Sequence, residues 1–370
     1  MRMTHILTSR VTFFLPNLAV GGAERALVNL AAGFARRGFE TDFVLVKAEG
    51  ELLANLPVQA RVVDLNLSST YACLYPLTRY LRQARPSVVI SALDLTNLFM
   101  LIARQFSRIP LKLAITLHST ISIQYRPFIK KKLEKILLGW FYPAADEIVA
   151  VSRGVAEDYC RYTRLAPERV RVIYNPIILP GLSQQCHAHL EHPWFQPGQP
   201  PVILGVGRLT FPKNFQLLIR AFRQVRENHL CRLLILGEGD QRPELEALAA
   251  DTGLQAEISM PGAVTNPYAY MSRAAGLVLS SRYEGLPTVM VEAMACGCPV
   301  ISTDCPSGPR EILNDGQYGY LVPMDDATSL AQAIIRTLAG EARRPPAEWL
   351  RQFELDYATG QYIQLLLTRS

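Results

Sequence analysis

Two cations stand close together in residues 207–213, which have the sequence GRLTFPK. The apolar run before them, Val202–Val206, is predicted as an inner strand, so Arg208 and Lys213 would follow its carboxyl end. A cation in a loop is more often a solvated surface charge, but open α/β sheets bind their ligands at this edge. Arginine offers a planar fork of donors to phosphate oxygens, and lysine offers a point charge. The segment therefore predicts a diphosphate site.

Two carboxylates, Glu284 and Glu292, flank the start of a predicted helix, Thr288–Cys296. Pro287 suits the first turn of such a helix, which places Glu284 in the preceding loop and Glu292 on the helix itself. A glycosidase acid–base pair needs carboxyl groups roughly 5–9.5 Å apart. Eight residues of continuous helix span about 12 Å. The spacing therefore favours two separate contacts to one extended ligand.

A glycine pair, Gly21 and Gly22, lies between the predicted strand Val11–Leu15 and a helix that begins near Ala23. Glycines let the backbone approach a ligand, and the amino terminus of a helix favours anions. A tight turn without a ligand explains the pair equally well. The pattern is not the GxGxxG fingerprint, so a nicotinamide or flavin cofactor is disfavoured.

One histidine, His118, ends the predicted strand Leu113–Leu117. A lone histidine is more often a structural residue, but the carboxyl end of a central strand favours a role in binding. The histidines within residues 187–192 have an HxHxxH spacing with no cysteine or carboxylate scaffold around them. We therefore assign no metal site to that segment.

A stretch of cations and aromatic residues, 125–142, is predicted as an amphipathic helix. This combination is typical of a membrane-surface element, and a solvated helix face is the alternative. The net charge of +6 is concentrated in residues 1–190, which carry 23 Lys and Arg against 13 Asp and Glu. No recognisable nucleic-acid-binding module is present, so we expect no nucleic-acid partner. The residues expected at an anionic membrane are Lys130, Lys131, Lys132, Lys135 and Trp140.

Short apolar runs alternate with amphipathic stretches along the whole chain. Uniformly apolar strands separated by helices predict parallel sheets that are covered on both faces. The fold class is therefore α/β, with two doubly wound, Rossmann-like domains that face each other across a cleft. The predicted strands are Val11–Leu15, Thr41–Val46, Arg61–Leu65, Ser87–Leu93, Leu113–Leu117, Glu147–Ser152, Val170–Tyr174, Val202–Val206, Leu233–Leu236, Glu257–Met260, Gly276–Ser281, Val300–Thr303 and Tyr320–Val322.

Composition marks the boundary between the domains. The segment Leu179–Pro201 contains five prolines and two glycines without periodicity, which predicts a linker over residues 179–200 between domains at 1–178 and 201–346. Residues 347–370 contain a predicted helix, Ala347–Leu367, whose apolar side chains need a partner surface across the domain junction.

Length and composition exclude several classes of protein. The chain has 370 residues, of which 49% are hydrophobic and 19% are charged, as in a globular protein. No apolar run approaches the roughly 20 residues of a membrane helix, and Met1–Arg10 lacks the features of an export signal. The seven cysteines form no CxxC pair, which favours small buried side chains in a reducing compartment. Integral-membrane and secreted proteins are therefore disfavoured.

Three motifs occur in a fixed order along the chain: the GGAE turn at 21–24, the GRL segment with Lys213, and the segment from Glu284 to Val300. In this combination the chain resembles the retaining glycosyltransferases of the bacterial "glycosyl transferases group 1" family, which have the GT-B fold. The resemblance covers nearly the whole chain and is strongest over residues 201–323. Residues 304–312 resemble members that build surface glycans from UDP-hexoses or UDP-N-acetylhexosamines.

The resemblance implies a role for each candidate residue. Arg208 and Lys213 would bind the donor diphosphate, and Glu292 would bind the ribose hydroxyls. Glu284 would hold the donor sugar, and His118 would face it near the anomeric carbon. The implied catalytic set is Arg208, Lys213, Glu284 and His118, and the implied donor-binding set is Gly21, Gly22, Gly207, Gly285, Leu286, Pro287, Thr288 and Glu292.

One departure from the family pattern affects the donor loop. Many relatives carry Phe-Gly where this chain has Leu286-Pro287. Because proline has no N–H, one backbone donor is absent from that loop.

The resemblance also implies a mechanism. Negative charge grows on the departing diphosphate during transfer, and fixed cations stabilise it. Asp325-Asp326 begins a late helix, and no other acidic pair suits a metal. We therefore expect retaining transfer without a metal or a cofactor other than the nucleotide-sugar donor. The acceptor would be a lipid-linked or lipopolysaccharide-type glycan, reached by a cytoplasmic protein attached to the inner face of the membrane.

Two other functions remain open. A nucleotide-sugar epimerase of the same architecture would need neither an acceptor nor the basic aromatic helix. A catalytically inactive relative would bind glycans only, but it has no reason to keep Arg208, Lys213, Glu284 and Glu292 together.

Overall fold

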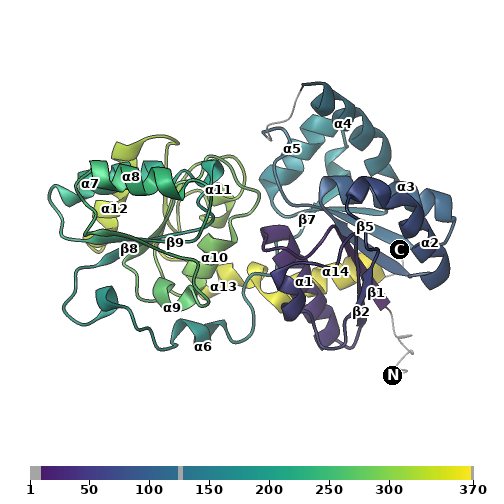
Figure 1. Ribbon diagram of the computed structural model, residues 1–370, viewed down its shortest axis with the longest axis horizontal. Helices are drawn as coiled ribbons and strands as arrows, with labels where there is room; N and C mark the ends of the chain where they lie inside the picture. The colour runs from purple at the N-terminus through teal and green to yellow at the C-terminus, as the bar shows by residue number, and fades with distance from the viewer. Residues whose placement is uncertain (1–9, 124–127, 368–370) are drawn as a thin grey trace. The chain divides into compact units, whose positions relative to one another are not determined.

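The chain folds into two compact units, each built on one parallel β-sheet (Figure 1). The computed structural model describes residues 10–123 and 128–367. The first unit runs to Ile177 and takes up the chain again from Gln352, and the second unit comprises Ile178–Arg351. Within the described residues, the first sheet has seven strands and the second has six. The α/β class with two doubly wound sheets is therefore confirmed.

The sheet of the first unit has the strand order β3-β2-β1-β4-β5-β6-β7, and neighbouring strands are parallel. In β1, every residue after Arg10 is buried because helices cover both faces of the sheet. The predicted strands are present, with ends that shift by at most two residues. They are β1 (Arg10–Leu15), β2 (Glu40–Leu45), β3 (Arg61–Asp64), β4 (Val88–Ala92), β5 (Lys112–Leu117), β6 (Glu147–Ala150) and β7 (Val170–Val172).

The helices of the first unit lie on both faces of its sheet (Figure 1). Helices α2 to α5 cover one face, and α1 and α14 lie together on the other. Tyr362 and Leu366 of α14 share a buried cluster with Leu27 and Val28 of α1. The helices are α1 (Gly22–Arg36), α2 (Leu74–Ala84), α3 (Asp94–Ser107), α4 (Phe128–Phe141), α5 (Arg153–Thr163) and α14 (Leu355–Leu367), with short 3₁₀ turns η1 (Glu51–Asn55), η2 (Thr70–Ala72), η3 (Tyr142–Ala144) and η4 (Pro167–Arg169).

The second unit repeats the scheme with the strand order β10-β9-β8-β11-β12-β13. Helices α7, α8 and α12 cover one face of this sheet, and α7 buries the apolar stripe that its 3.6-residue period predicts. The strands are β8 (Val202–Val206), β9 (Arg232–Leu236), β10 (Ile258–Gly262), β11 (Gly276–Leu279), β12 (Val300–Thr303) and β13 (Tyr320–Val322). The helices and 3₁₀ turns are α6 (Leu182–Cys186), η5 (Pro193–Phe195), η6 (Phe211–Lys213), α7 (Phe215–Arg226), α8 (Arg242–Asp251), α9 (Tyr268–Met271), α10 (Thr288–Ala295), α11 (Pro309–Ile312), α12 (Ala327–Leu338) and α13 (Ala347–Leu350).

Residues 179–200, predicted as a linker, contain α6 and η5 and pack on the second unit. The carbonyl of Cys186 accepts hydrogen bonds from Ser272 Oγ at 2.7 Å and from Arg273 Nη1 at 3.2 Å. His192 lies against the ring of Tyr270 at 5.9 Å between centroids. Contacts with α9 and the residues next to it hold the segment in place. These contacts produce no periodic pattern of apolar residues, so the sequence did not indicate them.

The C-terminal helix predicted over Ala347–Leu367 is divided in the structure. The short helix α13 is followed by η7 (Arg351–Phe353) and then by α14. Trp349 Nε1 donates to the carbonyl of Ile312 in the second unit, and the carbonyl of Phe353 accepts from the amide of Ile177 in the first. The break therefore marks the point where the chain returns to the first unit.

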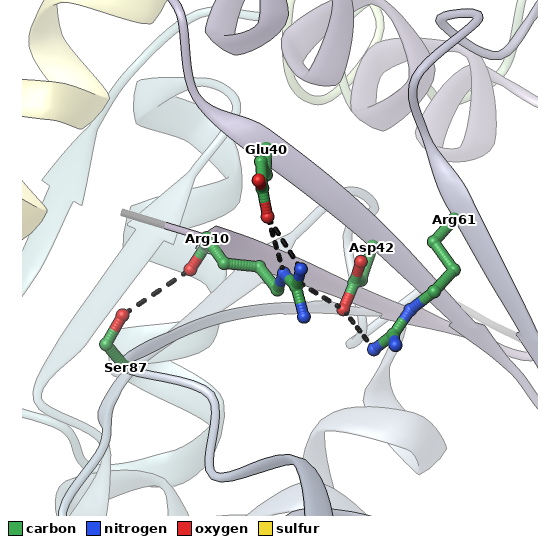
Figure 2. A network of polar contacts seen from close by, with 5 residues as sticks. All are labelled: Arg10, Glu40, Asp42, Arg61 and Ser87. Carbon is green, nitrogen blue, oxygen red and sulfur yellow. Dashed lines mark hydrogen bonds and ion pairs between the residues drawn. The ribbon is translucent and has the colours of Figure 1, made fainter. Parts of the chain in front are cut away.

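A network of ion pairs closes the amino-terminal edge of the first sheet (Figure 2). Asp42 of β2 is only 2% exposed, and it accepts from Arg61 Nη2 at 2.7 Å while Arg10 Nε lies at 3.7 Å. Arg10 also pairs with Glu40 at 2.6 Å. Such partners offset the cost of burying a carboxylate. The network lies at the amino-terminal ends of β1, β2 and β3, whereas His118 of the same unit follows the carboxyl end of its strand, β5.

Candidate active site

The order of the second sheet reverses between β8 and β11, its two central strands. Chain segments that leave neighbouring parallel strands on either side of such a switch point diverge, and ligands bind in the space above their carboxyl ends. The loop after β8 carries Gly207, Arg208 and Lys213, and the loop after β11 carries Glu284. The topology therefore brings together two motifs that are more than 70 residues apart in the sequence.

Lys213 and Glu284 form an ion pair at this switch point. Lys213 Nζ lies 2.6 Å from Glu284 Oε1, and Ser281 Oγ donates to the same carboxylate oxygen at 2.6 Å. The two charged side chains are 20% and 11% exposed. Both are therefore held in place and still reach the surface of the loops.

The two loops that carry this pair are joined through their backbones. The amide of Arg282 donates to the carbonyl of Pro212 at 2.8 Å, and Ser280 Oγ donates to the carbonyl of Lys213 at 2.9 Å. The Arg282 guanidinium also covers the ring of Phe211 at 4.3 Å. These contacts fix the position of Lys213 relative to Glu284.

Arg208 extends from the loop after β8 as an exposed side chain. The backbone of this loop is held against the loop after β9, because the amide of Leu209 donates to the carbonyl of Glu238 at 2.8 Å. A Cβ atom at Gly237 would lie 1.9 Å from the carbonyl oxygen of Gly207. Gly237 and Gly239 were not among the predicted site residues, although two glycines after the predicted strand Leu233–Leu236 were a usable signal.

The donor loop predicted at residues 285–288 rests on residues 306–308, which follow β12. Ser307 Oγ donates to the carbonyl of Gly285 at 2.8 Å. Gly308 has a φ of 93°, and a Cβ atom there would lie 2.3 Å from Pro287 Cδ. Leu286 and Pro287 are buried, so their side chains shape the loop from within, and Thr288 begins α10. Sequence reasoning gave residues 307–308 no role because only the fold places them under this loop.

Glu292 lies on α10, one turn beyond its start, and is 8% exposed. Tyr268, the first residue of α9, donates its hydroxyl to Glu292 Oε1 at 3.4 Å. Glu284 and Glu292 thus have different partners, Lys213 for one and Tyr268 for the other.

Gly21 is the residue before α1 and Gly22 begins this helix, after the loop that follows β1 in the first unit. Gly22 is exposed, and a Cβ atom there would meet no other atom within 4 Å. The carboxylate of Glu24 covers Gly21, and a Cβ atom at Gly21 would lie 2.2 Å from Glu24 Oε2. A phosphate at this turn would lie close to the carboxylate of Glu24 as well as to the helix amides.

His118 follows β5 at the carboxyl edge of the first sheet. Its Nε2 atom lies 2.8 Å from Thr116 Oγ1. Its Nδ1 atom is enclosed and has no hydrogen-bond partner among the residues that the structure describes. Burial lowers the pKa of His118 to about 4, so the ring is neutral at pH 7.

Helix α4 carries the predicted membrane-side residues, and its lysines divide into two kinds. Lys131 Nζ donates to the carbonyl of Ser122 at 2.5 Å, and Lys135 Nζ lies 5.7 Å from the ring centroid of Tyr162. Lys132 is exposed. The side chain of Lys130 and residues Tyr125 and Arg126 lie outside the described part of the chain.

The exposed face of α4 is more apolar than the lysine cluster suggests. Leu133, Ile136 and Trp140 are 56%, 49% and 82% exposed, and their spacing places them on one stripe of the helix. We call these three residues the α4 stripe. In residues 10–123 and 128–367 no helix is both long and apolar enough to cross a bilayer, and no group of three potential ligands for a metal occurs.

Comparisons with known proteins match both halves of the chain to glycosyltransferase families. The model of "Glycosyl transferases group 1" matches residues 200–340, and that of "Glycosyltransferase Family 4" matches residues 20–179. HepE of Anabaena, solved in complex with UDP-glucose, has a TM-score of 0.73 at 19% identity and covers 96% of this chain and 95% of its own. That likeness is one of fold.

Two curated relatives come from Campylobacter jejuni. One is an N-acetylgalactosamine-N,N'-diacetylbacillosaminyl-diphospho-undecaprenol 4-alpha-N-acetylgalactosaminyltransferase, 32% identical over 253 residues, or 68% of this chain and 67% of that protein. The other is the alpha-1,4-N-acetyl-D-galactosaminyltransferase named for GalNAc-alpha-(1->4)-GalNAc-alpha-(1->3)-diNAcBac-PP-undecaprenol, 26% identical over an alignment of 378 residues that covers 96% of this chain and 98% of that protein. The motifs and both sheets agree with these matches, and the chain therefore belongs to the group 1 glycosyltransferases with the GT-B fold.

Proposed function

We propose that this chain is a retaining glycosyltransferase that moves a hexose or an N-acetylhexosamine from a UDP-linked donor to a glycan on a polyprenyl diphosphate. The observation that carries the proposal is the Lys213–Glu284 pair at the switch point of the second sheet, in a chain of this family. There a cation and a carboxylate lie side by side. A nucleotide sugar needs such a pair, because its diphosphate binds a cation and the hydroxyls of the attached sugar donate to a carboxylate.

Lys213 and Arg208 would stabilise the leaving diphosphate. An ammonium has three donors, so Lys213 can hold Glu284 and still donate to a phosphate oxygen. Arg208 is exposed beside Gly207, where its planar fork can bind a second phosphate oxygen. Fixed donors of this kind contribute about 3–4 kcal/mol each to lowering such a barrier. We propose that the reaction needs no metal and that the leaving phosphate takes the acceptor proton.

Three further residues would bind the rest of the donor. A carboxylate accepts several hydroxyl hydrogen bonds, so Glu292 would bind the ribose, with Tyr268 orienting it. Glu284 would bind the donor sugar together with the backbone amides of Gly285 and Thr288. His118, whose ring is neutral at pH 7, would accept a hydroxyl of the transferred sugar through Nδ1.

The linkages in the names of the two Campylobacter jejuni relatives support retention. Both names specify an alpha linkage of N-acetylgalactosamine. UDP-N-acetylhexosamines of this type carry their sugar in an α linkage to the diphosphate. Transfer from an α-linked donor to an α-linked product retains the configuration of the anomeric carbon.

Both relatives are also named for acceptors on undecaprenyl diphosphate, a lipid of the membrane. We propose an acceptor of the same class, with a lipopolysaccharide-type acceptor as the alternative. An acceptor that stays in the bilayer requires the enzyme to reach the membrane surface. The α4 stripe, with exposed Lys132 beside it, suits peripheral attachment to the anionic cytoplasmic leaflet.

The experiment that tests the proposal is a transfer assay with a matrix of donors and acceptors. UDP-N-acetylgalactosamine, UDP-N-acetylglucosamine, UDP-glucose and UDP-galactose are each offered with a short glycan on polyprenyl diphosphate or with a lipopolysaccharide core. We expect transfer to the polyprenyl-linked glycan in excess EDTA, and an anomeric proton of the product with the small coupling of an α linkage. Loss of activity in EDTA, restored by magnesium or manganese, would overturn metal independence.

The same assay separates the competing functions. Conversion of a UDP-sugar to its epimer in the absence of any acceptor would identify an epimerase. Binding of the glycan without turnover of any donor would identify an inactive relative. Transfer to the lipopolysaccharide core alone would replace the proposed acceptor and leave the transferase assignment in place.

A further inference from the structure

We propose that Thr116 is a positioning residue, which fixes the His118 ring in the tautomer that carries its proton on Nε2 and leaves Nδ1 as an acceptor for a hydroxyl of the transferred sugar. The tautomer itself follows from the hydrogen-bond geometry around His118 alone. Its use for sugar binding rests on the function proposed above.

Two consecutive hydrogen bonds connect His118 through Thr116 to the backbone of β4, and each donor and acceptor in them can be assigned. Thr116 Oγ1 lies 3.0 Å from the carbonyl oxygen of Ser91 and donates to it, because a carbonyl can only accept. A threonine hydroxyl has a single proton, so Thr116 Oγ1 can then only accept from His118 Nε2, at 2.8 Å. The direction of the first bond therefore sets the protonation of the ring.

The residues that form these two hydrogen bonds are held rigidly. Ser91 and Thr116 are each fully buried on neighbouring parallel strands, where Ala92 pairs with Thr116 in the register of β4 and β5. Asn97 of α3 also donates from Nδ2 to the carbonyl of Thr116 at 3.0 Å. Because no water competes at full burial, reversal of one bond leaves a polar atom without a partner.

The other tautomer fits the surroundings poorly. With the proton on Nδ1, the Nε2 lone pair would face an oxygen whose proton is committed to Ser91, and a buried N–H would lack an acceptor among the described residues. Rotation of the Thr116 hydroxyl toward Nε2 would instead break its bond to Ser91. Protonation of both nitrogens is also opposed, because burial lowers the pKa of His118 to about 4.

The same geometry leaves His118 Nδ1 as a hydrogen-bond acceptor for a ligand. Nδ1 of the Nε2–H tautomer carries a lone pair, and that atom is enclosed without a partner among the described residues, so a ligand reaches it when the groups that cover it move aside. A sugar hydroxyl is a donor of matching chemistry. A site built to accept a hydroxyl proton discriminates against a substrate that lacks this hydroxyl, since the buried acceptor then stays unpaired.

The tautomer is tested by ¹⁵N nuclear magnetic resonance of the ring nitrogens in the protein without donor. The chain has six histidines, and a His118→Gln variant identifies the signals of His118. We expect the wild type at pH 7 to carry its proton on Nε2. We expect Thr116→Val to give a mixture of tautomers and Thr116→Ser to restore the wild-type pattern. A proton on Nδ1 in the wild type, or an unchanged pattern in Thr116→Val, would overturn the assignment.

The positioning role is tested by kinetics with the same variants. We expect Thr116→Val to lower kcat/KM at least about tenfold with the full donor sugar and to change it little with deoxy donors that lack the bound hydroxyl. Thr116→Ser should recover most of the loss, and all three proteins should unfold within a few degrees of one another. Equal losses with full and deoxy donors would mean that Thr116 acts only through stability. If the wild type transfers no sugar, the proposed function fails, while the resonance experiment still decides the tautomer.

Discussion

Lys213 Nζ and Glu284 Oε1 lie 2.6 Å apart, although 71 residues separate them in the chain. The contact exists because β8 and β11 are neighbours at the switch point of the second sheet, so the loops after them meet. Ser281 Oγ donates to the same carboxylate oxygen at 2.6 Å and helps to hold it. The two charges are thus held side by side before any ligand binds, as the proposed contacts to a diphosphate and a sugar require.

Loss of either cation should slow the chemical step. We expect Lys213→Ala and Arg208→Ala each to lower kcat at least about a hundredfold, because both donors act on charge that grows in the transition state. Arg220→Ala, which removes an exposed cation on α7, is the matched control and should leave kcat unchanged. Steady-state kinetics with the best UDP-sugar measures the effect. Near-wild-type turnover of Lys213→Ala would refute the diphosphate assignment.

Removal of Glu292 should weaken donor binding more than it slows turnover. Ribose contacts are similar in the ground state and the transition state, so Glu292→Ala should raise the KM of the donor with a much smaller effect on kcat. Tyr268→Phe removes the hydroxyl that donates to Glu292 and should raise KM less. A defect confined to kcat in Glu292→Ala would contradict the ribose role.

A methyl group at Gly308 should disturb the donor loop. Gly308→Ala combines a φ of 93° with a Cβ atom 2.3 Å from Pro287 Cδ, whereas Gly340→Ala has a φ of 88° and a Cβ atom in open space. A positive φ disfavours an alanine at either position, and the ψ of −61° at Gly308 also lies outside the left-handed helical region. We expect both variants to lose stability in urea unfolding, Gly308→Ala to lose more, and kcat/KM to fall in Gly308→Ala alone. Similar activities of the two variants would show that Pro287 adapts without effect on donor binding.

Stability should fall with acidification in a way that depends on His118. Its pKa is about 4 in the folded chain, below the usual value of 6.5, so between these values the unfolded chain binds a proton that the folded chain excludes. The free energy of unfolding should therefore decrease as the pH falls from 6.5 toward 4, by at most about 3 kcal/mol from this group. His118→Gln should lose this part of the decrease, and His187→Gln, at an exposed position, should keep it. Urea unfolding at several pH values measures this dependence. If the free energy of unfolding falls equally steeply with pH in the two variants, the pKa of His118 is not lowered as stated.

Attachment to membranes should depend on the α4 stripe and on charge in different ways. Wild-type protein should float with anionic liposomes, and a variant with Leu133, Ile136 and Trp140 changed to Ser should lose the part of binding that persists at high salt. Lys132→Glu with Lys135→Glu should weaken binding at low salt, since each cation near the surface contributes about 1 kcal/mol and salt screens it.

The control for this flotation experiment is Tyr75→Ser, which removes an exposed aromatic residue from α2 rather than α4. It should float as the wild type does. If neither the wild type nor any variant floats at low salt, the membrane proposal is wrong, and a soluble acceptor replaces the lipid-linked one.

The sequence by itself determined most of the helices and strands and indicated the candidate site residues. Apolar runs such as Val202–Val206 and Val300–Thr303 became strands with the predicted ends, because burial on both faces of a parallel sheet demands uniformly apolar side chains. Arg208, Lys213, Glu284 and His118 could be predicted as candidates because their place after a strand is a local property of the chain.

Only the tertiary structure decided which of these residues meet and how each is held. The pairing of Lys213 with Glu284 depends on the order of strands in the sheet, which local periodicity does not encode. The support of the donor loop by Gly308, the order of residues 179–200 and the break before α14 likewise arise from contacts between distant segments. The hydrogen bond from Lys131 to the carbonyl of Ser122 also depends on the fold, since a lysine that donates to a backbone carbonyl has the same sequence signal as a solvated one.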